Sequence, residues 1–174
     1  MSGDQSYQDE GVAAAARFDQ MRGAYLREYL GLERMVQTTL VLIVGPRDVQ
    51  AFLHLVERTG MRHQVAVVRQ QLEQLDLLSA TARGVLKAVD KRTEERNRFA
   101  HRFLSLPIYS QGVDGGDPVF EGLHHRPGVE LEPLPIAQFK AESEALVDTK
   151  LSYLHEVHWP LQEALRSSDG ADDG

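Results

Sequence analysis

Three residues in the second half of the chain combine side chains that can carry out acid–base chemistry on a phosphate. Arg96, Asn97 and His101 lie within six consecutive positions. A histidine with an ordinary pKa of about 6.5 can accept or donate a proton at neutral pH. The planar guanidinium of arginine binds phosphate oxygens in pairs. Asn97 precedes His101 by four residues, so its amide is placed to hold the imidazole in one tautomer.

A helix must position these residues, and the sequence predicts one that Ser79 begins. Its expected inner face is formed by Ala82, Val85, Leu86, Val89, Thr93, Arg96, Ala100 and Phe103. An arginine on such a face is costly unless it is paired or lies at an interface or cleft. On a continuous helix His101 lies about 140° around from Arg96, so one chain cannot bring both side chains to one face. Glu94 lies on the His101 face, where it could pair with Arg98.

Positive charge gathers around this helix, although the chain as a whole has a formal charge of −7. Residues 83–102 contain seven basic and three acidic side chains. Such a segment is typical of a phosphate-binding surface, but also of a solvated helix face with Glu–Arg pairs. Residues 1–10 and 167–174 each carry three acidic and no basic side chains. We expect both ends to be disordered, solubilising tails.

The rest of the sequence predicts an all-α fold. Apolar residues recur at helical spacing over residues 12–43, 49–59, 61–75 and 136–161, with Asp48 as a cap and a kink at Pro160. Residues 105–135 hold five of the seven prolines, and Val119-Phe120 and residues 129–132 could form a β-hairpin there. We therefore expect one domain over residues 11–166, an antiparallel bundle of four or five helices with an irregular insertion at about 105–135.

Several classes of protein are excluded or disfavoured. The chain has no cysteine, which excludes disulfides, thiolate metal sites and a cysteine nucleophile. It has no glycine-rich phosphate loop with its Lys-Ser/Thr, no Gly-x-Ser-x-Gly and no His-Glu-x-x-His. The longest apolar run, residues 40–44, is far shorter than the roughly 20 residues of a membrane span. No signal peptide opens the chain, so we expect a cytoplasmic protein that does not contact membranes.

A metal site is a disfavoured alternative. His155 and His158 have the i, i+3 spacing of a ligand pair, but the paired Glu-x-x-His pattern of helical metal sites is missing. We expect no metal ion and no cofactor. Phe99 and Phe103 are expected in the core, and Trp159 in the core or at an interface rather than as a ligand platform.

The segment Arg96-Asn97-Arg98-Phe99-Ala100-His101 resembles the signature of HEPN domains. That signature is an arginine and a histidine separated by four to six residues, often with a polar residue after the arginine. The resemblance implies a helical bundle that usually forms a homodimer, with the motif residues of both subunits meeting in one cleft. Many members are metal-independent ribonucleases in toxin–antitoxin, phage-defence or RNA-processing systems. A cognate antitoxin or a nucleotidyltransferase is thus an expected partner. In some toxins of the family such an enzyme modifies a tyrosine two residues after the histidine, but this chain has Phe103 at that position.

The resemblance implies cleavage of single-stranded RNA through its own 2′-hydroxyl. His101 from each subunit would act as base or acid, Arg96 would hold the scissile phosphate, and Asn97 would orient the ring. Arg92, Arg98 and Arg102 would bind flanking phosphates. Other members of the family have lost catalysis, so a non-catalytic dimer that binds RNA or a protein stays open. In that case Arg96 pairs with a buried glutamate, and His101 is an ordinary histidine near a helix C-terminus.

Overall fold

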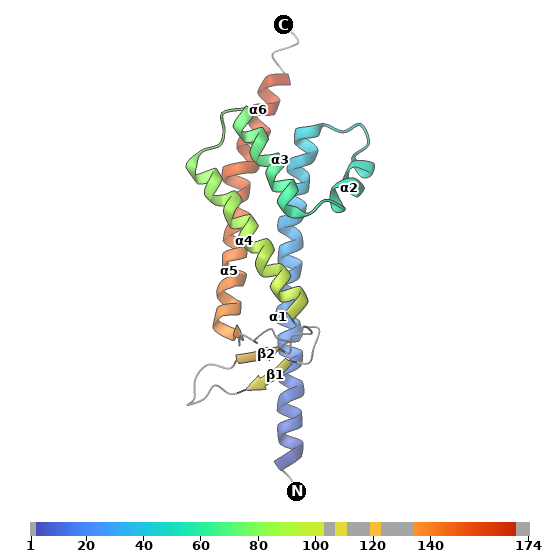
Figure 1. The fold of residues 1–174 in the computed structure, drawn as a ribbon, viewed down its shortest axis with the longest axis vertical. Helices are drawn as coiled ribbons and strands as arrows, with labels where there is room; N and C mark the ends of the chain where they lie inside the picture. Colours follow the sequence, from blue (N-terminus) through green and yellow to red (C-terminus); the bar gives the residue numbers. More distant parts are fainter. Residues whose placement is uncertain (1–2, 103–106, 111–118, 123–133, 170–174) are drawn as a thin grey trace. The chain divides into compact units, whose positions relative to one another are not determined.

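The computed structural model describes residues 3–102, 107–110, 119–122 and 134–169, and side chains over residues 12–13, 16–100 and 137–167. The predicted all-α class is confirmed (Figure 1). The helices are, in chain order, α1 (Gly3–Val44), α2 (Val49–Glu57), α3 (Met61–Gln74), α4 (Ala80–Arg102), α5 (Ile136–Tyr153) and α6 (Trp159–Asp169), with a π-helical turn η2 (Leu154–His158) before α6. No described helix combines the length and the apolar composition that crossing a membrane requires.

The ends of these helices follow local chemistry. Asp48 caps α2 by accepting a hydrogen bond from the N–H of Ala51 at 2.9 Å, and Ser79 does the same for Ala82 at the start of α4, at 3.0 Å. Gly45 ends α1 with a φ of 53°, a left-handed conformation that glycine adopts without steric cost. The predicted helix boundaries at these residues are confirmed. The sequence could predict them because each depends on neighbours within one turn.

A small antiparallel sheet lies between α4 and α5 in the chain. It consists of β1 (Pro107–Ser110), β2 (Val119–Gly122) and β3 (Leu134–Pro135) in that order. Ile108 is paired with Glu121, and Phe120 with Leu134. The predicted strand at Val119-Phe120 is confirmed, whereas its predicted partner at 129–132 lies outside the described residues.

The chain divides into two compact units, and the predicted single domain over residues 11–166 stays a prediction. The first unit comprises Met1–Glu28 and Glu95–Ala145, and the second comprises Tyr29–Glu94 and Leu146–Gly174. Helices α1, α4 and α5 therefore each contribute residues to both units. Helix α1 begins at Gly3 and α6 continues to Asp169, and the predicted disordered tails stay a prediction.

Aromatic rings form the core of the first unit. Tyr25 and Phe99 meet edge to face with ring centroids 4.6 Å apart, and Phe139 lies 4.7 Å from Phe99. Phe18 meets Phe139 at 6.3 Å. All four side chains are buried, so the prediction that Phe99 belongs to the core is confirmed. Phe99 thereby fixes the helix that carries the motif in this unit.

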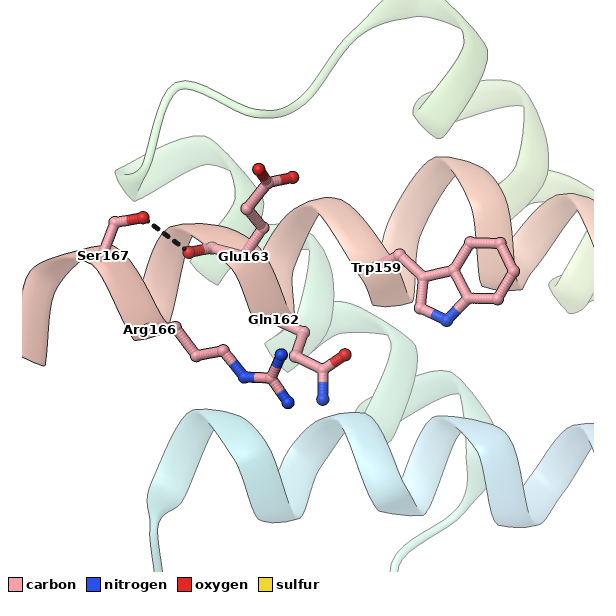
Figure 2. A pocket seen from close by; sticks show the side chains of 5 residues that line it. All are labelled: Trp159, Gln162, Glu163, Arg166 and Ser167. Carbon is pink, nitrogen blue, oxygen red and sulfur yellow. Dashed lines mark hydrogen bonds between the residues drawn. The ribbon is translucent and has the colours of Figure 1, made fainter.

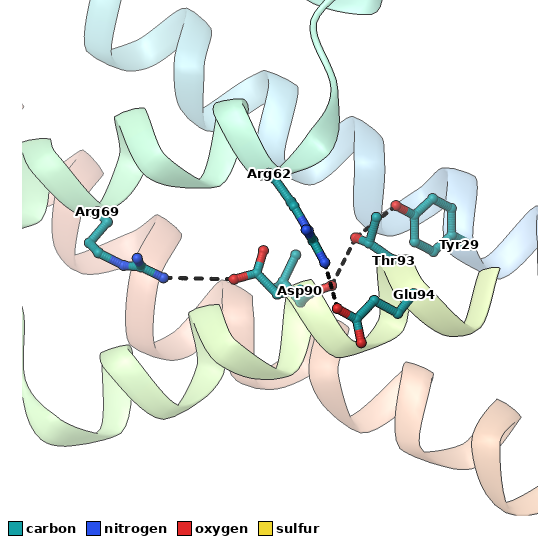
Figure 3. Close-up of polar contacts among 7 residues, drawn as sticks. Tyr29, Arg62, Arg69, Asp90, Thr93 and Glu94 are labelled. Carbon is teal, nitrogen blue, oxygen red and sulfur yellow. Dashed lines mark hydrogen bonds and ion pairs between the residues drawn. The ribbon is translucent and has the colours of Figure 1, made fainter. Parts of the chain in front are cut away.

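Aliphatic side chains from α1, α3, α4 and the C-terminal helices fill the core of the second unit. They include Leu32, Val36, Leu40, Val65, Val68, Leu72, Leu86, Val89, Leu146, Val157 and Leu161. Polar contacts border this core (Figure 3): Arg62 pairs with Glu94, Arg69 with Asp90 at 3.8 Å, and Tyr29 donates to Thr93 Oγ1 at 3.0 Å. The two ion pairs link α3 to α4 at exposed positions, where such pairs add little stability.

A π-helical turn precedes Pro160, where the sequence predicted a kink, and the kink itself stays a prediction. Pro160 has no N–H to donate to the carbonyl four residues earlier, so regular α-helical bonding cannot continue through it. The N–H of Trp159 instead donates to the carbonyl of Leu154, five residues back. The chain continues as a helix on both sides of η2, which places α6 after the turn.

Candidate functional site on helix α4

Helix α4 runs without a break from Ala80 to Arg102. Arg96, Asn97 and the backbone of His101 therefore lie on one helix, in its last turns, with positions 96 and 101 about 140° apart. The side chains of His101 and Arg102 lie outside the described residues. The proposed meeting of imidazole and guanidinium stays a prediction.

The buried face of α4 agrees with the predicted one from Ala82 to Val89. Beyond Val89 it is shifted by one position along the chain. Arg92, Glu95 and Phe99 are buried, whereas Thr93, Arg96 and Ala100 are half-buried. The expectation that Arg96 continues the apolar face was wrong, because Arg92 and Glu95 are the buried charged residues of this helix. Arg96 is therefore more accessible than the sequence indicated.

Arg96 and Asn97 contact each other directly. The Arg96 Nη1 atom donates a hydrogen bond to Asn97 Oδ1 at 3.0 Å. Asn97 itself is exposed. Besides this bond, the Asn97 amide has its NH₂ group and the second lone pair of its oxygen for further partners. If Asn97 holds the His101 ring, as predicted, it can donate to a ring nitrogen that carries no proton or accept from one that does.

The other charged residues of the motif pair differently from the prediction. Arg98 Nη1 contacts both carboxylate oxygens of Glu95, at 3.0 and 3.1 Å. Glu94, the predicted partner of Arg98, pairs instead with Arg62 of α3. Because Glu95 is nearly buried, its carboxylate competes with any phosphate for Arg98.

Arg92 does not lie where a flanking phosphate could reach it. Only 4% of its surface is exposed, and it belongs to the second unit, whereas Arg96, Asn97 and Arg98 belong to the first. A buried arginine serves the fold unless the structure opens. The predicted RNA-binding role of Arg92 is therefore not supported by its position. The side chain of Arg102 lies outside the described residues, so its predicted role stays a prediction.

Sequence reasoning missed a pocket in the first unit, of about 480 Å³. Its lining residues come from α1 and α5: Arg17, Gln20, Met21, Ala24, Phe139, Lys140, Ser143 and Glu144. The spacing of the four α1 residues, at i, i+3, i+4 and i+7, is the only signal that the sequence held. Phe139 joins this pocket to the motif helix, since its ring contacts Phe99.

A second pocket, in the second unit, has a volume of about 430 Å³ (Figure 2). Trp159, Gln162, Glu163, Arg166 and Ser167 of α6 line it. Trp159 is 47% exposed, so it does not belong to the core of this chain. Its ring is met edge to face by His155, with centroids 4.4 Å apart.

Two titratable groups of the second unit have pKa values shifted by burial. Burial lowers the pKa of His158, whose Nδ1 lies 2.9 Å from Thr39 Oγ1. Burial raises the pKa of Tyr153 well above its ordinary value, and the hydroxyl of Thr39 offsets only part of that shift. His155 contacts the indole of Trp159, and His158 contacts the hydroxyl of Thr39. Among the described residues, no group of three histidine or carboxylate side chains is arranged to hold a metal.

Comparisons of the chain with protein-family models, curated proteins and solved structures find no match. The resemblance to HEPN domains therefore rests on the sequence motif of α4.

Proposed function

We propose that this protein is a HEPN-like, metal-independent endoribonuclease that cleaves single-stranded RNA. The observation that carries the proposal is the position of Arg96, Asn97 and His101 in the last turns of one unbroken helix, with Arg96 half-buried rather than enclosed. The proposal includes a cytoplasmic homodimer. In a toxin or defence context, it also includes a cognate antitoxin or nucleotidyltransferase that restrains the enzyme.

RNA supplies its own nucleophile, so the protein has to move two protons and stabilise charge. The 2′-oxygen attacks the phosphorus, its proton passes to the imidazole of one His101, and the 5′-oxygen leaves with a proton from the partner subunit's His101. The products end in a 2′,3′-cyclic phosphate and a 5′-hydroxyl. Each proton transfer by a positioned side chain typically contributes about 10²–10⁴-fold to the rate.

Arg96 would stabilise the charge that develops on the phosphate oxygens. Its hydrogen bond to Asn97 restricts the guanidinium before substrate arrives, which reduces the cost of ordering it in the transition state. The remaining N–H groups of the fork would face the phosphate. Asn97 thus acts as a positioning residue for Arg96 and, through its NH₂ group, for the ring of His101.

Binding of the flanking phosphates would fall to Arg98 and Arg102. Arg98 must exchange its contact with Glu95 for a phosphate, which weakens its contribution. Because Arg92 is buried, only Arg98 and Arg102 of the three predicted flanking arginines are left for the RNA backbone. We therefore expect modest affinity and little sequence preference at the motif.

One observation favours a second candidate, the non-catalytic dimer that binds RNA or a protein. Arg92 is buried and Arg98 is paired with the nearly buried Glu95, so part of the positive charge near the motif serves the fold. In this alternative Arg96 and Asn97 form a surface contact without chemistry.

The deciding experiment is cleavage of 5′-labelled single-stranded RNA by purified protein in EDTA. The wild type should produce ends with a 2′,3′-cyclic phosphate. His101→Ala and Arg96→Ala should each lower the rate by about 10²-fold or more. Matched controls are His63→Ala and Arg58→Ala, which remove the same side chains from exposed positions outside the motif and should leave the rate unchanged.

Far-UV circular dichroism and size-exclusion chromatography should show that all four variants fold and assemble like the wild type. Equal cleavage by His101→Ala and wild type contradicts the proposal. RNA binding without cleavage by the wild type supports the non-catalytic candidate.

A further inference from the structure

The single tryptophan of the chain is exposed at the edge of a pocket. Trp159 is 47% exposed, although tryptophan usually buries most of its large apolar surface. The pocket beside it, of about 430 Å³, falls in the size range of small-molecule sites, roughly 300–1,000 Å³. An exposed aromatic ring on a pocket wall is a surface on which another planar group can stack.

Two polar side chains share the face of α6 that carries this ring. Gln162 follows Trp159 by three residues and Arg166 by seven, and all three project from the same side of the helix in Figure 2. Glu163 also lines the pocket but projects from another side of the helix. Within the described part of the chain, neither Gln162 nor Arg166 has a side-chain hydrogen bond or ion pair.

A second ring contacts the indole. His155, one turn earlier in η2, meets it edge to face at 4.4 Å with an interplanar angle of 84°. This contact restricts the rotation of Trp159, so less side-chain freedom is lost when a ligand stacks on the indole. A π-helical turn directly before the pocket is a feature that is common at functional sites.

These groups match the chemistry of a nucleotide. An indole face binds a flat base, a guanidinium binds a phosphate, and an amide can both donate to and accept from a base edge. Trp159 is the one aromatic side chain among the residues that line the pocket, and Arg166 is the one cation.

We propose that Trp159, Gln162 and Arg166 form a binding site for one nucleotide of single-stranded RNA. The base stacks on the indole, its edge meets the Gln162 amide, and its phosphate meets Arg166. The inference rests on the proposed function for the identity of the polymer, but it requires no cleavage. Stacking tolerates any base, so the site adds affinity rather than strong sequence preference.

Trp159 itself reports binding, because it is the chain's only tryptophan. Wild-type protein is titrated with a 2′-O-methyl oligoadenylate, which lacks the free 2′-hydroxyl and cannot be cleaved by 2′-attack. Stacking should quench the indole fluorescence in a saturable way. In fluorescence anisotropy with the labelled oligonucleotide, Trp159→Ala should bind about 5- to 150-fold more weakly, the range expected for one lost stacking contact.

Arg166→Gln tests the phosphate contact separately. It should reduce the slope of log K against log salt by about 0.7, the value for one phosphate contact with a single strand. The matched control is Arg58→Gln, which removes the same charge from an exposed position at the end of α2 and should leave that slope unchanged. Trp159→Phe keeps a ring with less stacking area and should fall between the wild type and Trp159→Ala.

The possible results separate this inference from the proposed function. Cleavage of RNA without quenching of Trp159 overturns the inference and leaves the ribonuclease standing. Quenching without cleavage supports the nucleotide site and contradicts the ribonuclease. Stronger quenching by an acidic peptide than by the oligonucleotide overturns the inference in favour of a protein partner, and so does a salt slope that Arg166→Gln leaves unchanged.

Discussion

Thr39 on α1 and His158 on η2 are joined by a hydrogen bond of 2.9 Å, although 119 positions separate them in the chain. The Thr39 hydroxyl donates its single proton to the carbonyl of Met35, at 2.9 Å. When the hydroxyl proton goes to Met35, the bond between Thr39 and His158 is donated by the imidazole Nδ1.

The burial of His158 predicts a loss of stability in acid. Because burial lowers its pKa in the folded protein, the unfolded chain binds a proton more readily below about pH 6.5. The free energy of unfolding should therefore decrease as the pH falls from 7.5 to 5.5. Urea unfolding of His158→Gln, which cannot titrate, should show a shallower decrease over this range than the wild type.

The control for this prediction is His63→Gln, at an exposed position of α3. It should keep the wild-type dependence on pH. Parallel curves for His158→Gln and wild type would rule out His158 as the titrating group.

Tyr153 predicts a second loss of stability, in base. Burial raises its pKa well above 10, so the folded protein keeps the phenolic proton at a pH where the unfolded chain releases it. The free energy of unfolding should therefore decrease as the pH rises above about 10. Tyr153→Phe should remove this part of the decrease in urea unfolding between pH 9 and 11. An ultraviolet titration in which every tyrosine ionises near pH 10 in the folded protein would contradict it.

Gln64 should stabilise the junction between α2 and α3 in the folded protein. Its side chain is 2% exposed, and Nε2 donates to the carbonyls of Val56 at 3.0 Å and Thr59 at 2.7 Å. Gln64→Leu leaves both carbonyls without this donor and should lower the free energy of unfolding by about 1–3 kcal/mol. Gln70→Leu, on an exposed position of the same helix, is the matched control and should change it far less. Similar losses for the two variants would show that the carbonyls find other donors.

Gly84 offers a stabilising substitution within α4. A Cβ atom there would have no neighbour within 4 Å, and its backbone is helical. Gly84→Ala should raise the free energy of unfolding by about 0.5–1 kcal/mol, because alanine loses less backbone entropy on folding. Gly45→Ala should do the opposite, since the φ of 53° strains any residue with a Cβ. Thermal unfolding of the pair should thus shift in opposite directions, and a common direction would contradict the argument.

The sequence predicted best what depends on a few neighbouring residues. Asp48, Ser79 and Gly45 mark helix ends through contacts within one turn, and the structure has these ends. The interruption before Pro160 follows from the missing N–H of proline. The predictions that failed required knowledge of tertiary packing.

The inner face of α4 is the clearest example. From Asp90 to Arg98 the helix has no apolar residue, so hydrophobic periodicity cannot distinguish two faces that differ by one position. Burial of Arg92 and Glu95, rather than Arg96, is decided by the neighbouring helices. The exposure of Trp159 is equally invisible in the sequence, because an apolar residue at helical spacing normally predicts burial.

The π-helical turn has a consequence for the angular phase of the C-terminal helix. A turn closed by i→i+5 bonds holds one residue more than an α-helical turn, so it offsets everything that follows by about 100° around the axis. Deleting one residue from Leu154–His158 would restore regular α-helical bonding and rotate Trp159, Gln162 and Arg166 together by that angle. The direction of these three side chains therefore depends on the extra residue in η2, and not on the residues of α6 alone.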